Sequence, residues 1–193
     1  DIRTFYQKGV RMFATDSEAD LRNIAKAAPG ARIYTRILTE GTLTADWPLS
    51  RKFGCESDMA MDLLILARDL GLEPYGVSFH VGSQQREIGA WDAALGKVKV
   101  IFNRLWEEDR IKLKMINMGG GFPANYLQRT NELSIYAEEI ARFLHEDFLD
   151  DMPEIIIEPG RSMVSNAGVL VSEVVLISRK SRTALHRWVY TDV

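Results

Sequence analysis

The stretch that decides the fold is residues 75–118, YGVSFHVGSQQREIGAWDAALGKVKVIFNRLWEEDRIKLKMINM. It begins with a β-branched and aromatic run over residues 75–81 and ends with an apolar run over residues 113–118, and both runs predict strands. Between them, apolar residues recur three or four positions apart, which predicts a long helix with one buried face. These residues are Ile88, Trp91, Leu95, Val98, Phe102 and Leu105. A strand, a helix and a strand in this order form the unit of a parallel α/β fold.

The same alternation continues in both directions along the chain. Upstream, we predict strands over residues 10–14 and 33–38, a helix between them that Asp16 or Ser17 could cap, and a second helix over residues 57–70. Downstream, we predict a helix over residues 133–148 and a short buried strand over residues 154–157. About five strand–helix units result, whereas a closed eight-unit barrel needs roughly 250 residues. We therefore predict an α/β fold that is part of a (β/α)8 TIM-like barrel.

The pattern changes after Arg161. Residues 167–178 and 188–190 have the composition of strands, with no helix between them, which indicates a crossover into a β-rich domain. We expect one domain over residues 1–165 and the beginning of another over residues 166–193. Because the chain starts with Asp1 and its last residues interrupt a strand-like run, we expect both domains to be incomplete.

Composition narrows the classes of function. The 193 residues carry 24 basic and 27 acidic side chains, a net charge of -3, without a basic run interleaved with aromatic residues, which disfavours a nucleic-acid partner. No stretch approaches the roughly 18 consecutive apolar residues of a membrane span. Cys55, the single cysteine, cannot form an internal disulfide, and we interpret it as a small packed residue. We expect a cytoplasmic protein without a metal site.

Chemically interesting residues lie at or directly after the ends of four of the predicted strands. In parallel α/β folds, ligands gather at the carboxyl ends of the strands, so these residues should share one rim. They are Arg36, then His80 with Gly82 and Ser83, then Gly119, Gly120 and Gly121, and finally Glu158, Pro159, Gly160 and Arg161.

The glycine run allows more than one interpretation. Three glycines let a backbone approach an anion closely, but they also form ordinary tight turns. Gly119, Gly121 and Ala124 fit a loose dinucleotide-binding pattern, although Pro123 disrupts the strand–turn–helix context that this pattern needs. Ser83 offers a hydroxyl donor and Arg161 a fixed cation, and together with the glycines they favour a phosphate site.

Single polar residues at strand ends are weaker evidence. His80 and Arg36 could equally be structural, since hydrogen-bonded histidines and arginines are common at such positions. Glu158 is more informative, because a carboxylate directly after three isoleucines is costly to bury without a cationic or protonated partner.

Three motifs identify the family that this chain resembles. Gly76-Val-Ser-Phe-His-Val-Gly-Ser-Gln84, Met118-Gly-Gly-Gly-Phe-Pro123 and Glu158-Pro-Gly-Arg161 occur in the order found in the pyridoxal-phosphate-dependent decarboxylases that act on ornithine, lysine and diaminopimelate. The resemblance covers nearly the whole chain and implies the barrel fold of alanine racemase. Trp47-Pro48, residues 51–54 and the segment from Ser165 to Gly168 look closest to the bacterial ornithine/lysine branch.

The resemblance implies a role for each motif residue. His80 would stack on the pyridine ring, and Glu158 would pair with the ring nitrogen, where alanine racemase has an arginine. Arg36 would lie near the cofactor, and Lys52 would lie at a dimer interface. The cofactor phosphate and its surroundings would be held by Ser83, Gly119, Gly120, Gly121, Pro159, Gly160 and Arg161.

The resemblance also implies what a complete enzyme needs besides these residues. The family's Schiff-base lysine precedes the segment matched here, and further site residues belong to the C-terminal domain of the partner subunit in a homodimer. We therefore expect this segment alone to be inactive. The leading hypothesis is decarboxylation of ornithine or lysine in polyamine biosynthesis. Arginine or diaminopimelate decarboxylation, a non-catalytic homologue similar to antizyme inhibitor, and a dinucleotide-binding oxidoreductase are the alternatives.

Overall fold

The computed structural model describes residues 1–40, 44–49 and 52–193, and these form two compact units, Asp1–Met163 and Val164–Val193. The helices are α1 (Ile2–Gln7), α2 (Glu18–Ala27), α3 (Ser57–Asp69), α4 (Gly89–Asp109), α5 (Leu133–Phe148), the 3-10 helix η2 (Leu149–Asp151) and α6 (Arg161–Val164). The strands are β1 (Met12–Thr15), β2 (Arg32–Arg36), β3 (Ala45–Trp47), β4 (Glu73–Ser78), β5 (Ser83–Gln85), β6 (Met115–Asn117), β7 (Glu154–Ile156), β8 (Val174–Ser178) and β9 (Trp188–Thr191).

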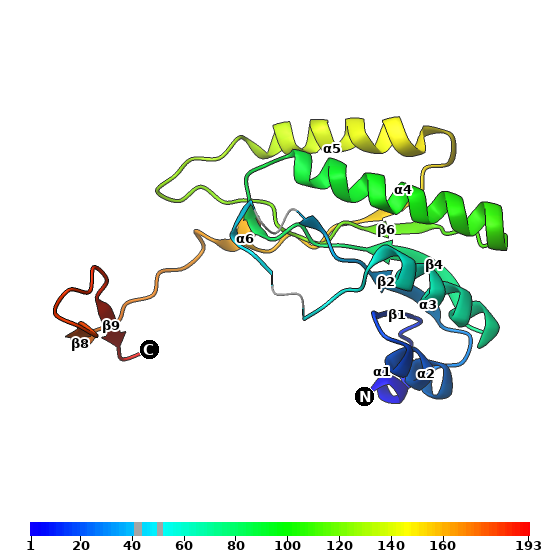
Figure 1. The fold of residues 1–193 in the computed structure, drawn as a ribbon, viewed down its shortest axis with the longest axis horizontal. Coiled ribbons are helices and arrows are strands. Elements are labelled where there is room, and N and C mark those ends of the chain that lie inside the picture. Colours follow the sequence, from blue (N-terminus) through cyan, green and yellow to red (C-terminus); the bar gives the residue numbers. More distant parts are fainter. Residues whose placement is uncertain (41–43, 50–51) are drawn as a thin grey trace. The chain divides into compact units, whose positions relative to one another are not determined.

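A five-stranded parallel sheet organises the first unit. Its strand order is β1-β2-β4-β6-β7, so each strand lies beside the next sheet strand along the chain, as in an arc of a barrel (Figure 1). Each helix from α2 to α5 contacts the next one along the chain, and each strand of the sheet likewise contacts the next sheet strand. The predicted α/β fold with a partial barrel is therefore confirmed.

The core lies between this sheet and its helices. Trp91, Leu95, Val98 and Leu105 of α4 are all buried, whereas Ile88 and Phe102 are partly buried and pack against them. On β2, Ile33 and Thr35 point to this buried side and the alternate residues Tyr34 and Arg36 point to the other side. The second set of side chains is thereby directed into the barrel interior, where the strand-end residues lie.

Local sequence explains several element boundaries. Ser17, rather than Asp16, caps α2, and its hydroxyl accepts a hydrogen bond from the Asp20 N–H at 3.4 Å. The carboxylate of Asp16 instead accepts a hydrogen bond from the Gly54 N–H at 2.7 Å, which ties the segment before α3 to the end of β1. In β4, Gly76 faces Met115 so closely that a Cβ would lie 2.2 Å from the Met115 carbonyl oxygen.

The structure corrects three of the predicted elements and adds several short ones. The strand predicted over residues 75–81 ends at Ser78, and the chain turns so that Ser83–Gln85 pairs antiparallel with β3. Both β3 and β5, with α1 and α6, escaped prediction because they are short. The strand at residues 154–157 is not buried, since β7 is an edge strand and Ile157 is 49% exposed. The strand predicted from Ala167 begins only at Val174.

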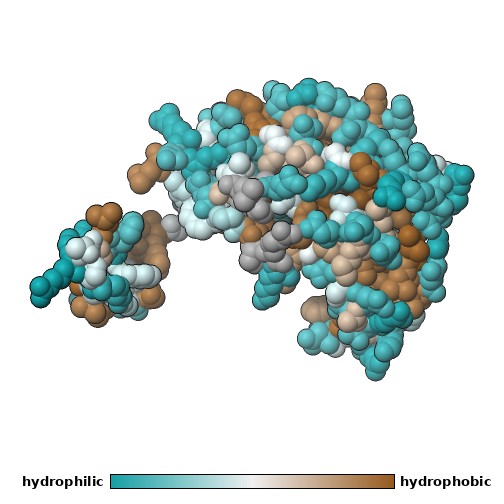
Figure 2. All heavy atoms as spheres, in the orientation of Figure 1, coloured by the Kyte–Doolittle hydropathy of each residue, from teal (hydrophilic) through white to brown (hydrophobic). Residues whose placement is uncertain are grey.

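The second unit is an antiparallel hairpin of β8 and β9. Its strands expose their large apolar side chains, and brown atoms are visible on this unit among paler and teal ones in Figure 2. An isolated two-stranded hairpin is marginally stable in water, and this one leaves its apolar side chains exposed. Among the described residues, no helix is both long and apolar enough to cross a membrane.

Candidate functional site

The ends of neighbouring parallel strands bring most of the predicted residues together. Arg36 ends β2, His80 follows β4, the glycine run follows β6, and Glu158 follows β7. Two groups of side chains form there. We call Tyr34, Arg36, His80, Asn117 and Glu158 the carboxylate cluster, and Trp47, Ser83, Tyr126 and Arg161 the guanidinium cluster.

Asn117 is the buried centre of the carboxylate cluster. Its Nδ2 donates a hydrogen bond to Glu158 Oε1 at 2.7 Å, and its Oδ1 accepts one from the Gly119 N–H at 2.9 Å. The backbone N–H of Glu158 donates to the Gly119 carbonyl at 2.7 Å, which closes the arrangement. In the described part of the chain Glu158 Oε2 has no hydrogen-bond partner, so one carboxylate oxygen is held and the other is available.

Glu158 differs from the expectation in its exposure. The residue is exposed, not buried, because it follows the edge strand β7. Its protein partner is the neutral amide of Asn117, so the desolvation argument made from the three preceding isoleucines is wrong. The carboxylate of Glu158 is nevertheless held in one orientation by the buried side chain of Asn117.

His80 is half-buried beside this carboxylate. Its Nδ1 accepts a hydrogen bond from the Gly82 N–H at 3.0 Å, which leaves the ring proton on Nε2. Burial, followed by the nearby charge of Arg36, lowers the pKa of His80, although Glu158 acts in the opposite direction. At neutral pH the imidazole is therefore uncharged and fixed in one tautomer.

Tyr34 and Asn117 were missed by sequence reasoning. Burial, followed by the negative charge of Glu158, raises the pKa of Tyr34, so its hydroxyl stays protonated at neutral pH. The alternation of side chains along a strand could have identified Tyr34, because it lies two residues before Arg36 and so faces the same side of the sheet. Asn117 immediately precedes Met118 and the glycine run, and its position at a strand end was the signal that could have identified it.

Arg161 is the centre of the guanidinium cluster. Its Nε donates to Ser83 Oγ at 3.1 Å and its Nη1 donates to the Tyr126 hydroxyl at 3.0 Å. The guanidinium also lies 4.5 Å from the centre of the Trp47 ring. Trp47 is opposite Ser83 in the β3–β5 pairing, which explains how one side chain reaches both. Both hydroxyls accept from Arg161 and keep their own protons to donate.

The glycine run packs between the loops that carry these clusters. A Cβ on Gly119 would lie 2.4 Å from the Phe79 carbonyl oxygen, and one on Gly120 would lie 2.7 Å from the Glu158 carbonyl oxygen. On Gly121 it would lie 2.6 Å from the Gly82 carbonyl oxygen. The glycines are thus required for backbone packing within the protein, whatever they contact in a ligand.

Two further contacts hold the segment after the glycines. The buried Gln84 side chain donates to the Ala124 carbonyl at 2.6 Å and accepts from the Ala124 N–H at 2.9 Å. Phe122 stacks on Trp91 with ring centres 5.2 Å apart. The helix α4 therefore supports the site through its most buried aromatic residue.

Other predicted residues contribute less defined contacts. Arg36 lies 5.8 Å from the Phe53 ring centre, and the Lys52 ammonium lies 5.3 Å from the same ring. Pro159 and Gly160 occupy the turn between Glu158 and Arg161, and a Cβ on Gly160 would meet no atom within 4 Å. Cys55 is buried, and burial raises its pKa to about 11. Arg51 lies outside the described residues.

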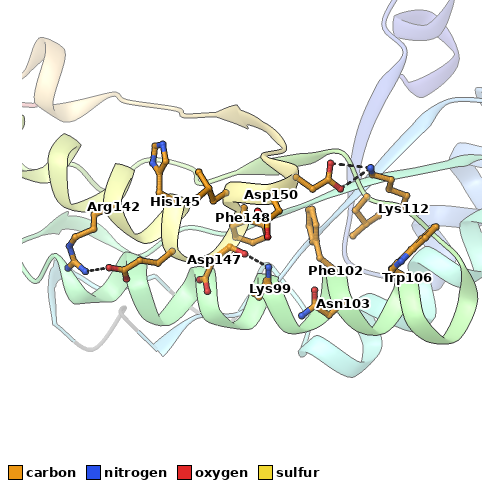
Figure 3. A pocket seen from close by; sticks show the side chains of 14 residues that line it. Lys99, Phe102, Asn103, Trp106, Lys112, Arg142, His145, Asp147, Phe148 and Asp150 are labelled. Carbon is orange, nitrogen blue, oxygen red and sulfur yellow. Dashed lines mark hydrogen bonds and ion pairs between the residues drawn. The ribbon is translucent and has the colours of Figure 1, made fainter.

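The cavity drawn in Figure 3 lies elsewhere. It has a volume of about 850 Å³ and is lined by residues of α4, α5 and the segments after them, including Lys99, Trp106 and Arg142. None of the predicted site residues lines it. Within residues 1–40, 44–49 and 52–193, no group of three or more His, Cys, Asp or Glu side chains is placed to hold a metal ion.

The two clusters fit opposite parts of a phosphorylated aromatic cofactor. The guanidinium cluster offers a fixed cation and two hydroxyl donors, which suit a phosphate group. The carboxylate cluster offers a neutral imidazole and an oriented carboxylate oxygen, which suit a flat ring with a protonated nitrogen. The glycine loop connects the two.

Comparisons with known proteins point the same way. Residues 1–165 match the family described as "Pyridoxal-dependent decarboxylase, pyridoxal binding domain". A lysine/ornithine decarboxylase of Selenomonas ruminantium is 35% identical over 167 residues, which are 86% of this chain and 42% of the relative. Antizyme inhibitor 2 of Xenopus laevis is 33% identical over 179 residues, 90% of this chain and 38% of the relative.

Solved structures agree with the fold. A Selenomonas ruminantium lysine decarboxylase, solved with pyridoxal phosphate and cadaverine, superimposes with a TM-score of 0.78 at 30% identity, over 99% of this chain and 46% of that one. The chain spans less than half of the length of these relatives. The motifs, the strand-end geometry and the match over residues 1–165 together show that this chain belongs to the pyridoxal-phosphate-dependent decarboxylases of the ornithine, lysine and arginine group, whose cofactor is pyridoxal 5'-phosphate.

Proposed function

We propose that this chain is the cofactor-binding part of an enzyme that removes the α-carboxyl group of ornithine, lysine or both, giving putrescine or cadaverine for polyamine biosynthesis. The observation that carries the proposal is the pairing of an oriented carboxylate, Glu158, with a separate anion site formed by Ser83 and Arg161. This pairing matches the two polar ends of pyridoxal phosphate. The relatives named as ornithine and lysine decarboxylases support the choice of a basic amino acid.

The bound cofactor would supply an electron sink for the electron pair left when carbon dioxide departs. Glu158 Oε2 would accept a hydrogen bond from the protonated ring nitrogen and hold that proton in place. An arginine in this position would not stabilise the protonated nitrogen, so a carboxylate favours decarboxylation over racemisation.

His80 and Arg161 would position the cofactor at its ring and its phosphate. The neutral imidazole of His80, fixed by the Gly82 N–H, presents a flat surface beside Gly120 and Glu158. Arg161, Ser83 and Tyr126 would donate hydrogen bonds to the phosphate oxygens. We propose that the remaining predicted residues, Arg36, Gly119, Gly121, Pro159 and Gly160, border the same site.

The proposal extends to organisation and assembly. Residues 1–165 would belong to the pyridoxal-phosphate-binding barrel, and residues 166–193 would cross over into a C-terminal β-domain. By the family resemblance, the working enzyme would be a cytoplasmic homodimer whose active sites are shared between subunits, with Lys52 near the interface. Residues 1–193 alone would not catalyse the reaction, because the family's Schiff-base lysine and C-terminal site residues lie in other segments.

The decisive experiment uses the full-length protein given pyridoxal phosphate. We expect an absorption band of protein-bound cofactor, and release of carbon dioxide from ornithine or lysine in preference to arginine and diaminopimelate. The variant Glu158→Gln should keep the fold and lose most of this activity. Absence of the bound-cofactor band would refute the enzyme proposal, and activity on diaminopimelate alone would refute the proposed substrate class.

A second candidate function is that of a non-catalytic homologue. The similarity to Antizyme inhibitor 2 over 90% of this chain motivates it. The joint presence of Ser83, Glu158 and Arg161 favours the enzyme, because a protein that does not bind the cofactor has no evident need for the whole set. The band and the release of carbon dioxide distinguish the two functions directly.

A further inference from the structure

Asn117 lies in the candidate site but has no role among the proposed cofactor contacts. It is 4% exposed and lies at the end of β6, and its side chain is hydrogen-bonded at both ends. One end meets the carboxylate of Glu158 and the other meets the first glycine of the loop that packs against His80. Asn117 therefore connects the two elements that must be fixed relative to each other around a flat ring.

The orientation of the amide follows from its partners. The Gly119 N–H is a donor and requires the carbonyl oxygen of Asn117, whereas the Glu158 carboxylate is an acceptor and requires the NH₂ group. A rotation of the amide by 180° would place oxygen against carboxylate and NH₂ against N–H, and would break both contacts. The backbone contact from Glu158 N–H to Gly119 O fixes the distance that the amide spans.

We propose that Asn117 is a positioning residue that holds Glu158 Oε1, so that Oε2 is presented in a single direction to the protonated nitrogen of the cofactor ring. This inference rests on the proposed function. The raised pKa of Tyr34 is consistent with it, because burial and the charge of Glu158 keep the Tyr34 hydroxyl protonated beside this carboxylate. Because Glu158 is exposed and follows the edge strand β7, its side chain would sample several rotamers without this contact.

The first test measures cofactor affinity in the full-length protein. Replacing Asn117 by leucine removes both hydrogen bonds at similar volume and should weaken binding roughly ten-fold or more, since hydrogen bonds to charged groups are among the stronger ones. The matched control is Thr35→Val, which removes a buried hydroxyl without a described partner from the opposite side of the sheet and should leave affinity unchanged.

A double-mutant cycle separates positioning from a merely structural role. If Asn117 acts through Glu158, then Asn117→Leu combined with Glu158→Gln should bind the cofactor no more weakly than Glu158→Gln alone. Additive losses in affinity, or an unchanged affinity of Asn117→Leu, would overturn the proposal.

The second test needs neither the cofactor nor a variant of Asn117. In full-length protein labelled with ¹⁵N at asparagine, the side-chain NH₂ resonances of Asn117 should shift and exchange faster with solvent in Glu158→Ala, because one of these protons loses its acceptor. Unchanged resonances would show that the contact is not formed and would overturn the proposal. If the parent protein fails to bind cofactor, the proposed function fails, and this measurement still decides the role of Asn117.

Discussion

The carboxylate cluster and the guanidinium cluster are built in opposite ways, although both bear on one cofactor. Asn117, which organises the first, is buried at the end of a central strand, and its partners lie on the adjoining loops. Arg161, which organises the second, is held by Trp47 and Tyr126, two residues that are 51% and 44% exposed. The orientation of the ring would thus depend on the packed core, whereas that of the phosphate would depend on side chains at the surface.

This difference predicts which substitutions should weaken cofactor binding alone and which should also lower the stability of the fold. A change near Asn117 alters backbone contacts between β6, β7 and the loop at His80, so stability and binding should fall together. A change near Arg161 removes contacts of exposed side chains, so binding should fall while stability is retained.

The largest effect is expected for Gly119→Ala. Gly119 has φ of 62°, and an added Cβ would lie 2.4 Å from the Phe79 carbonyl oxygen, so both loops must move. We expect a loss of at least about 2 kcal/mol in the free energy of unfolding, measured by urea denaturation. Gly160→Ala is the control, because its Cβ meets nothing within 4 Å, and it should change stability by less than about 0.5 kcal/mol. If the two variants lower the free energy of unfolding equally, the stability of the fold does not depend specifically on the packing at Gly119.

Removing the phosphate from the ligand should separate the two clusters. In the full-length protein, Arg161→Ala should weaken binding of pyridoxal phosphate roughly ten- to a hundred-fold, by loss of charge-assisted hydrogen bonds, and barely affect binding of pyridoxal. Glu158→Gln should weaken binding of both ligands. Arg104→Ala is the control, since Arg104 pairs with Glu108 on the exposed face of α4. An equal loss for both ligands in Arg161→Ala would contradict a phosphate-specific role.

A smaller effect is expected from the aromatic support of Arg161. Trp47→Ala removes the ring beneath the guanidinium, and a cation–π contact at an exposed site is worth about 0.5–1 kcal/mol, or roughly two- to five-fold in affinity for pyridoxal phosphate. Trp106→Ala, which removes an exposed tryptophan of α4, is the matched control. Affinity equal to that of the parent would show that Ser83 and Tyr126 suffice to orient Arg161.

The same contrast explains how much could be predicted from the sequence. Hydrophobic periodicity identified α4 through Trp91 and its neighbours, and parallel connectivity predicted that Arg36, His80 and Glu158 meet at one rim. These features depend on local patterns and on general rules of the parallel fold. Trp47 and Tyr126 reach Arg161 through a short hairpin and a loop, and no periodicity marks such contacts.

Glu158 shows a different limit. Three preceding isoleucines resemble a buried strand, but burial is a property of neighbours, and β7 has a described sheet neighbour only in β6. The glycine run shows a third limit, because its sequence suits a turn, an anion site and a dinucleotide motif equally well. In the structure, a backbone carbonyl oxygen of Phe79, Gly82 or Glu158 lies opposite each glycine, and it leaves no room for a Cβ there.

The smallest predicted effect concerns pH and belongs to the carboxylate cluster. Burial and Arg36 lower the pKa of His80 in the folded protein, so the unfolded chain binds the proton more readily. The stability that comes from neutral His80 is therefore fully present above about pH 6.5 and is lost as the pH falls through the lower pKa of the folded state. His80→Gln should flatten the acid side of the stability–pH profile, measured by thermal unfolding. If His80→Gln keeps the parent's acid dependence, the imidazole is not held neutral by its surroundings.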